Sequence, residues 1–235
     1  MKLLAFELAT EACSVALWID GQVCERFELA PRRHAELALP WAAQLLAHAG
    51  IAKSQLDAIA VGRGPGAFTG VRLAIAIAQG IALALDRPIV PVSTLAALAM
   101  RTSAAEGACV LAAIDARMGE VYAGRFLLRD GDAVALADES VAAPAAVGLP
   151  DSGSDWFGVG TGFAAVDGLL RQRLVDRLVV CDAQALPHAE GVARLAAAAY
   201  QRGEAIVADR VEPAYLRNNV ALTIVEQQAL RDSRA

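Results

Sequence analysis

Residues 62–72, Gly-Arg-Gly-Pro-Gly-Ala-Phe-Thr-Gly-Val-Arg, are the segment of this sequence best suited to chemistry. Glycine adopts positive φ freely, and Pro65 fixes its own φ and lacks an N–H, so the segment predicts a loop rather than a helix or a strand. An apolar run typical of a strand precedes it, and a long apolar helix pattern follows from Val71. A glycine-rich loop that leads into a helix N-terminus directs backbone N–H groups towards an anion or a closely packed partner.

This loop matches neither of the common phosphate-binding motifs. The Gly-Lys-Ser/Thr ending of a Walker A loop is missing, and GxGxxG fits poorly. Two interpretations therefore stay open: an anion-binding loop, or a turn-rich connection that lets a strand and a helix pack closely. The candidate loop residues are Gly62, Gly64, Pro65, Gly66, Phe68, Thr69 and Gly70.

Two carboxylates end apolar runs of strand type, Glu7 in the first half of the chain and Asp115 in the second. With Thr10, they are candidates for holding a magnesium–nucleotide or another polar ligand in a cleft. The alternative is that each carboxylate caps its strand end or pairs with an arginine such as Arg63 or Arg117.

Metal and nucleophilic chemistry find little support in the sequence. The histidines are His34, His48 and His188, without an HExxH or HxxxH pair, so no metal site is predicted. His34 is expected to be a surface or capping residue at a helix start. No Ser/His/Asp or Cys/His arrangement stands out, and no catalytic residue is predicted. The four cysteines lack a CxxC pair and are typical of buried thiols in a reducing cytosol.

The composition favours an ordered globular protein of the cytoplasm. The chain has 235 residues and a formal charge of −5, which argues against tight, autonomous nucleic-acid binding. A carboxylate interrupts the N-terminal apolar run too early for a signal peptide. No apolar stretch approaches the roughly 20 residues of a membrane span, so no membrane association is expected.

The order of predicted elements repeats in the two halves of the chain. Each half reads strand, acidic end, strand, Asp-Gly turn and strand, with the turns at Asp20-Gly21 and Asp130-Gly131. Such a duplication suggests the α/β architecture of actin, sugar kinases and Hsp70 (ASKHA), in which two subdomains each hold a mixed sheet flanked by helices. The predicted subdomains are residues 1–105 and 106–235, and 143–155 is predicted to be a flexible connection. The expected strands are 2–8, 13–19, 22–29, 57–62, 88–92, 110–115 and 120–128, and the expected helices are 34–48, 71–85 and 93–105.

The predicted helix 71–85 is apolar on nearly every side. Between Arg72 and Asp86 it carries no charge, whereas a surface helix normally shows a polar face. We expect an intermolecular helix interface here, and the alternative is a fully internal helix. The candidate interface residues are Leu37, Trp41, Leu45, Arg72, Leu73, Ile77, Gly80 and Ile81.

Four segments together resemble the bacterial TsaB (YeaZ) family: 9–18, 62–72, 112–122 and 213–219. The resemblance implies an ASKHA fold and a role in making threonylcarbamoyladenosine beside the anticodon of tRNAs that read codons beginning with A. It implies a non-catalytic partner that activates TsaD, its catalytic paralogue, through helices of the first subdomain. The ATPase TsaE would join the pair, the free chain would form a homodimer, and tRNA would bind only through the complex. The resemblance implies no cofactor of the chain's own and leaves open whether ATP or ADP sits at the junction with TsaD.

Three positions depart from the family pattern. The usual Asp-Thr after the first strand reads Glu7-Leu8, the loop serine is Ala67, and a glycine after Leu73 is Ala74. The longer carboxylate and the missing hydroxyl weaken the case for a nucleotide in this chain's own cleft. They leave the expected partner face unchanged.

Two other functions compete with the scaffold. An ASKHA phosphotransferase acting on a small molecule would need a second phosphate loop, and the sequence presents only one. A glycoprotease-like hydrolase would need a metal pair or a nucleophile triad, which the sequence does not present.

Overall fold

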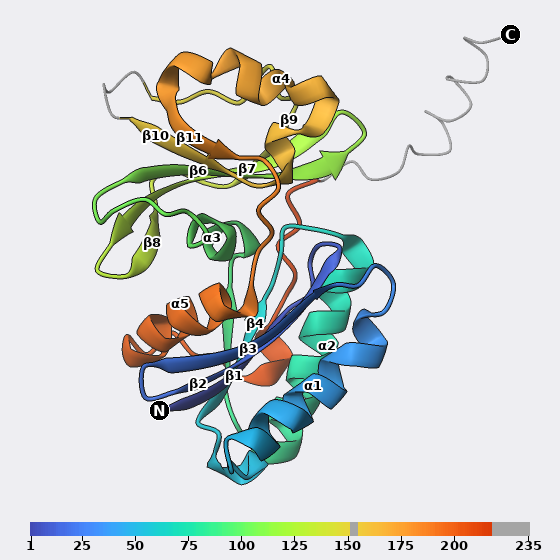
Figure 1. The fold of residues 1–235 in the computed structure, drawn as a ribbon. Coiled ribbons are helices and arrows are strands. Elements are labelled where there is room, and N and C mark those ends of the chain that lie inside the picture. Colours follow the sequence, from blue (N-terminus) through green and yellow to red (C-terminus); the bar gives the residue numbers. More distant parts are fainter. Residues whose placement is uncertain (151–154, 218–235) are drawn as a thin grey trace, which may run out of the picture.

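The computed structural model describes residues 1–150 and 155–217. Residues 220–235, whose charges and small side chains predict fraying, lie outside this range. Two β-sheets lie one above the other, each with helices packed on its faces (Figure 1). The strands are β1 (Lys2–Glu7), β2 (Ala12–Ile19), β3 (Gln22–Leu29), β4 (Ala58–Gly62), β5 (Ile89–Val92), β6 (Cys109–Arg117), β7 (Glu120–Arg129), β8 (Asp132–Ala135), β9 (Ser140–Ala142), β10 (Trp156–Val159) and β11 (Leu178–Asp182). The α-helices are α1 (His34–His48), α2 (Phe68–Leu85), α3 (Thr94–Ala99), α4 (Ala165–Arg173) and α5 (Ala189–Gln201). The 3-10 turns are η1 (Lys53–Gln55), η2 (Thr161–Phe163), η3 (Val175–Arg177) and η4 (Ala208–Arg210).

The two sheets have the same topology. The first runs β3-β2-β1-β4-β5, and the second runs β8-β7-β6-β10-β11 with β9 paired to β7. In the first sheet β1 is antiparallel to β2 and parallel to β4. In the second, β6 is antiparallel to β7 and parallel to β10. The duplication predicted from the sequence is confirmed, and the fold is an α/β fold of the ASKHA type.

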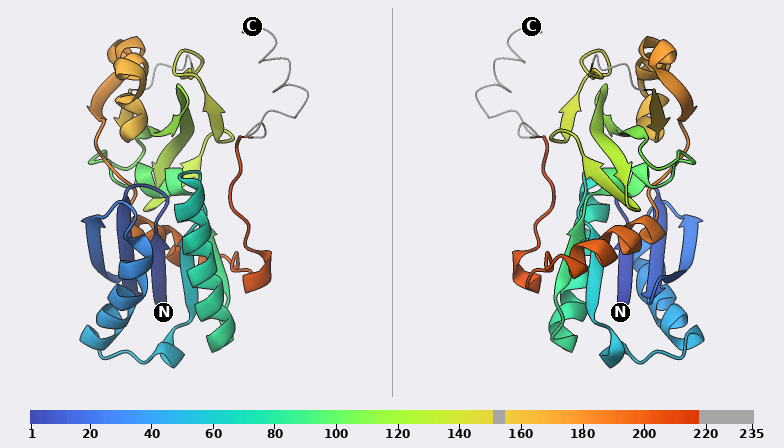
Figure 2. Two further views of the ribbon diagram at one scale, coloured as in Figure 1. Left: turned by 90° about the vertical axis from the view of Figure 1, so that its right-hand side faces the viewer. Right: turned by 90° about the vertical axis from the view of Figure 1, so that its left-hand side faces the viewer.

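Helices separate the sheets and cover their outer faces. Helices α1 and α2 lie side by side on one face of the first sheet, and α5 crosses the other face (Figure 2). Helix α3 packs on the second sheet from the side of α5, and α4 covers the opposite face. The middle layer is thus α3 and α5, with one sheet on either side.

Helix α5 comes late in the chain, yet it packs on β1, β2 and β4 of the first sheet. The N–H of Ala189 donates to Ser14 Oγ at 2.8 Å, and that of Glu190 donates to Glu25 Oε1 at 2.9 Å. His188 Nδ1 lies 2.8 Å from the other oxygen of Glu25. The first N–H groups of α5 are therefore satisfied by side chains of β2 and β3.

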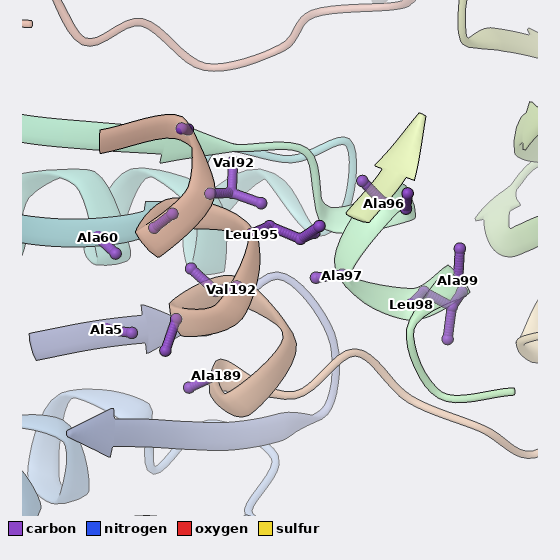
Figure 3. Close-up of a cluster of buried hydrophobic side chains, with 14 of the residues drawn as sticks. Ala5, Ala60, Val92, Ala96, Ala97, Leu98, Ala99, Ala189, Val192 and Leu195 are labelled. Atoms are coloured by element: carbon purple, nitrogen blue, oxygen red, sulfur yellow. The ribbon is translucent and has the colours of Figure 1, made fainter. Parts of the chain in front are cut away.

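The core beneath α5 is built mainly from small side chains. Figure 3 shows Val192 and Leu195 of α5 beside the strands that carry Ala5 and Ala60, with α3 on the other side. Alanines on the strands and on α3 let α5 approach both layers closely. A second cluster lies between the first sheet and α1 with α2, and a third lies between the second sheet and α4.

The predicted elements agree with the structure to within one residue apart from three boundaries. Helix α1 spans the predicted residues, and both Asp-Gly hairpins are confirmed, with Asp20 at φ 47° and Asp130 at φ 53°. Helix α2 begins at Phe68, so the expectation that all of 62–72 is loop is wrong for its second half. Helix α3 ends at Ala99 rather than at residue 105, and β6 reaches Arg117. Residues 151–154 of the predicted flexible connection lie outside the described range.

Helix α2 is 18 residues long and, by length and composition, apolar enough to cross a membrane, contrary to the sequence expectation. Its buried side is Val71, Ala74, Ile75, Ala78 and Ala82. These residues belong to the core cluster between the first sheet and α1, and a core helix passes the same test of length and composition.

Candidate functional site

A cavity of about 900 Å³ opens between the two subdomains at the ends of β1 and β6. The first subdomain contributes the turn after β1, the start of α1 and the start of α2. The second contributes the end of β6 and the turn after β10. The C-terminal segment 213–217 closes one side. The lining residues are Ala9, Thr10, Glu11, Pro31, Arg32, His34, Ala35, Gly66, Ala67, Phe68, Thr69, Gly70, Val71, Arg72, Leu73, Ile114, Asp115, Ala116, Arg117, Tyr122, Thr161, Pro213, Ala214, Tyr215, Leu216 and Arg217.

The glycine-rich loop is packed tightly against the end of β1. A Cβ placed on Gly70 would lie 2.0 Å from the carbonyl oxygen of Leu8, and one on Gly66 would lie 2.4 Å from that of Ala9. Gly64 has φ +94°, which favours glycine. These contacts support the interpretation of a connection that lets strand and helix approach closely. The same loop places the start of α2 on the cavity wall.

Glu7 lies beneath this loop and is not among the residues that line the cavity. Its Oε1 accepts the N–H of Ala9 at 2.8 Å, and its Oε2 accepts the hydroxyl of Thr94 at 3.0 Å. A Cβ on Gly62 would lie 2.0 Å from Oε2, so this glycine is needed to accommodate the carboxyl group. Burial raises the pKa of Glu7 to about 7, although both hydrogen bonds lower it. The expectation that Glu7 faces the cleft is wrong, because the loop covers it.

Asp115 does line the cavity, and its carboxylate is already engaged. Oδ2 accepts from the Arg117 guanidinium at 2.9 Å, and Oδ1 accepts the Arg117 N–H at 2.7 Å. The side chain of Asp115 is 29% exposed, whereas that of Arg117 is 82% exposed. The alternative in which the carboxylate pairs with a nearby arginine is confirmed for Asp115.

A second glycine-containing turn, Gly160-Thr161-Gly162, follows β10 as the glycine-rich loop follows β4. Thr161 Oγ1 accepts the N–H of Asp115 at 3.2 Å, which fixes the end of β6 to this turn. A Cβ on Gly160 would lie 2.3 Å from the carbonyl oxygen of Ala113. Sequence analysis missed this turn, although its Gly-Thr-Gly spacing after an apolar run was a usable signal.

Thr10 and His34 meet at the first subdomain's side of the cavity. The Nε2 atom of His34 lies 3.0 Å from the carbonyl oxygen of Thr10 and 3.1 Å from that of Ala12. Both partners are acceptors, so Nε2 carries the proton and donates. His34 thus fixes the turn after β1; it is the first residue of α1, but no side chain of the described residues caps the start of that helix, so the predicted capping role is wrong. Among residues 1–150 and 155–217, no group of three or more His, Cys, Asp or Glu residues is arranged to hold a metal ion.

The C-terminal segment contributes site residues that sequence analysis did not select. Tyr215 accepts a hydrogen bond from Arg72, whose guanidinium carbon lies 3.1 Å from the ring centre of Phe68 and 4.9 Å from that of Tyr215. Arg217 donates to Glu120 Oε2 at 2.6 Å and to the carbonyl oxygen of Ala116 at 3.1 Å. The segment therefore joins the start of α2 to the β6–β7 hairpin. In the sequence, the motif at 213–219 indicated the family but did not indicate that this segment lies at the cavity.

The predicted interface residues do not share one environment. Trp41 and Leu45 are 8% and 6% exposed and pack into the core, so their expected place on an outer face is wrong. The period of α1 turns these large side chains towards the sheet. Arg72 lies at the cavity mouth. Leu37, Leu73, Ile77 and Ile81 are half-buried, and Gly80 is exposed.

The outer face of α1 and α2 is largely apolar and carries small side chains. The exposed fraction is 51% for Leu39 and 69% for Leu83, and a Cβ on Gly80 would meet no atom within 4 Å. The interpretation of α2 as a fully internal helix is therefore wrong. We call this surface the helix face; its exposed apolar residues are Leu39, Pro40, Ala43, Ala47, Ala76, Gly80, Leu83 and Ala84, and Glu36, Gln44 and His48 of α1 are exposed as well.

Comparisons with known proteins agree with the resemblance seen in the sequence. Residues 27–224 match the family described as "TsaD: tRNA N6-adenosine threonylcarbamoyltransferase". The protein named "tRNA threonylcarbamoyladenosine biosynthesis protein TsaB" of Escherichia coli (strain K12) is 43% identical over 94% of this chain and 96% of its own. The protein of the same name from Haemophilus influenzae is 38% identical over 94% and 95%.

A solved structure gives the same result. The structure described as "YeaZ from Pseudomonas aeruginosa" superposes with a TM-score of 0.82 at 47% identity, covering 92% of this chain and 99% of the other. Another, with the same values, is described as an uncharacterized protein with similarity to peptidase YEAZ. The duplicated sheets, the glycine-rich loop and these relatives lead to one conclusion: the chain belongs to the TsaB (YeaZ) family of tRNA threonylcarbamoyladenosine biosynthesis.

Proposed function

We propose that this chain is a non-catalytic partner of TsaD that binds and activates it in threonylcarbamoyl transfer to the adenosine next to the anticodon. The observation that carries the proposal is the helix face. Exposed apolar patches of this kind mark partner sites. Small residues such as Gly80 and Ala84 allow a helix of another protein to approach closely.

The state of the two carboxylates supports a non-catalytic role. Glu7 is sealed beneath the glycine-rich loop, and Asp115 is paired with Arg117. Neither presents a free carboxylate to a ligand in the cavity. The proposal therefore includes no cofactor of the chain's own, and any ATP or ADP would lie at the junction with TsaD.

The proposal extends to the assembly and its location. TsaE would join the heterodimer, tRNA would reach this chain only within the complex, and the free chain would pair with a second copy through the helix face. All of this would take place in the cytoplasm.

The test is tRNA threonylcarbamoylation by purified TsaD, TsaE and the carbamoyl-adenylate synthase, with and without this chain. We expect activity to depend on the chain and to survive Asp115→Ala. Gly80→Glu should abolish pairing, measured by gel filtration with light scattering, because it places a charge on the helix face. Gly80→Ala is the matched control, since a methyl group there meets no atom in the monomer. Full activity without the chain, or normal pairing of Gly80→Glu, contradicts the proposal.

The second candidate function is ASKHA-type phosphotransfer to a small molecule. The turn at Gly160–Gly162 favours it, because it supplies the second glycine loop that the sequence did not reveal. This function predicts ATP turnover by the isolated chain that falls sharply in Asp115→Ala. Turnover that is absent, or unchanged in Asp115→Ala, removes it.

A further inference from the structure

The mouth of the cavity carries a stack of rings and a guanidinium that neither proposed role uses. The Arg72 guanidinium lies over the ring of Phe68, and the Tyr215 ring lies on the same guanidinium. Despite these contacts, Phe68 is 64% exposed and Tyr215 is 57% exposed. Exposed aromatic rings stiffened by a planar cation form a ready surface for another flat ring.

The charge around this stack is opposite to that of the whole chain. The cavity lining contains Arg32, Arg72, Arg117 and Arg217 against the carboxylates of Glu11 and Asp115, so the arginines exceed the carboxylates by two. The complete chain carries −5. Among the described residues, Arg32 and Arg72 have no carboxylate within ion-pair distance. An anionic ligand with flat rings fits this combination.

We infer that the cavity mouth binds an unpaired nucleotide of single-stranded RNA, with its base on the rings of Phe68 and Tyr215 and its phosphates near Arg32 and Arg72. Stacking on aromatic side chains together with arginine contacts to the backbone is how unpaired RNA is held. A cavity of about 900 Å³ has the size of a small-molecule site and accommodates one nucleotide. The inference rests on the proposed function. An acidic chain binds RNA weakly by itself, so the affinity for RNA beyond this one nucleotide must come from TsaD.

Two measurements on the complex of the full chain with TsaD test it. The first is fluorescence anisotropy with a labelled RNA stem-loop and, for comparison, a blunt RNA duplex with the same number of phosphates. We expect Phe68→Ala and Tyr215→Ala each to weaken stem-loop binding about tenfold and to leave duplex binding unchanged. Phe68→Trp, which keeps a ring, should retain the affinity. Val179→Ala, at a 55% exposed residue on β11, is the control.

The second measurement is ultraviolet crosslinking of the same stem-loop with 4-thiouridine in its loop, mapped by mass spectrometry. Crosslinks at Phe68 or Tyr215 support the inference. Wild-type stem-loop affinity in both alanine variants overturns it. Loss of TsaD from the complex in these variants also overturns it, because the stack would then be a protein contact.

The proposed function and this inference can fail separately. If the wild-type chain does not pair with TsaD, the proposed function fails, and the crosslinking is repeated with the full chain alone at high protein concentration. A crosslink at Phe68 or Tyr215 then retains the RNA site, and its absence overturns it.

Discussion

The ends of β1 and β6 occupy equivalent places in the two sheets but have opposite environments. At the end of β1, Glu7 is covered by the glycine-rich loop and bonded to Thr94. At the end of β6, Asp115 lies on the cavity wall and pairs with an exposed arginine. A duplicated topology therefore fixes where a carboxylate stands, while the packing of the glycine-rich loop over the strand end decides whether solvent or a ligand reaches it.

The largest difference between the two ends should come from the glycine-rich loop. In Gly70→Ala the new methyl group would meet the carbonyl oxygen of Leu8 at 2.0 Å, and backbone cannot move aside easily. We expect the free energy of unfolding to fall by more than about 3 kcal/mol, measured by urea denaturation. Gly80→Ala should instead be stabilising by about 0.5–1 kcal/mol. A Gly70→Ala protein as stable as the wild type contradicts the packing role.

The buried carboxyl of Glu7 predicts a pH dependence of the free energy of unfolding. Its folded-state pKa of about 7 lies above the ordinary 4.5, so its contribution to stability is full below pH 4.5 and is lost as pH rises through 7. Glu7→Gln, which stays neutral, should remove a loss of about 3 kcal/mol from the free energy of unfolding at pH 8. The check is urea denaturation of both proteins from pH 4 to 8. Parallel curves for the two proteins would exclude a neutral, buried Glu7.

The two threonines behind these carboxylates allow a matched comparison. Thr94 is fully buried, donates to Glu7 and accepts the N–H of Gly64. Thr161 is half-buried, and its hydroxyl accepts one N–H from the described part of the chain, that of Asp115. Replacement by valine should lower the free energy of unfolding by about 2 kcal/mol at Thr94 and by about 1 kcal/mol at Thr161. Thermal denaturation of both variants measures the difference. Equal losses of stability in the two variants would contradict the comparison, because they would mean that the ends of β1 and β6 are equally buried.

The smallest effect is expected at the exposed ion pair. Arg117→Ala removes the partner of Asp115, but an ion pair this exposed contributes less than about 1 kcal/mol. The melting temperature should therefore change little, and less in 0.5 M salt than in dilute buffer. A large loss of stability would show that Asp115 needs Arg117 as Glu7 needs Thr94.

The sequence was sufficient for the repeating pattern of strands and turns, because alternation and Asp-Gly pairs are local signals. It placed α1 at its observed bounds and identified the apolar character of α2. It could not show that Trp41 and Leu45 point inward, since an apolar helix surface does not reveal which side meets the sheet. Nor could it show that a loop 55 residues along the chain covers Glu7, because that contact is set by tertiary packing between Gly62 and Glu7.

The C-terminal part of the site was beyond reach for the same reason. Tyr215 and Arg217 act through Arg72 and Glu120, which lie about half the chain away or more. Such contacts follow from the path of the chain between the subdomains, and local sequence patterns do not predict them.

The capping of α5 by Ser14 and Glu25 has a consequence for synthesis. The first three strands leave the ribosome early, but the face of their sheet that α5 covers stays bare until Ala189–Gln201 has been made. Contacts between such distant segments slow folding. Until α5 is made, the uncovered apolar strands can bind chaperones or associate with other chains. The first subdomain to be translated is thus the last to be completed, and a nascent chain released before α5 emerges would carry an unfinished sheet.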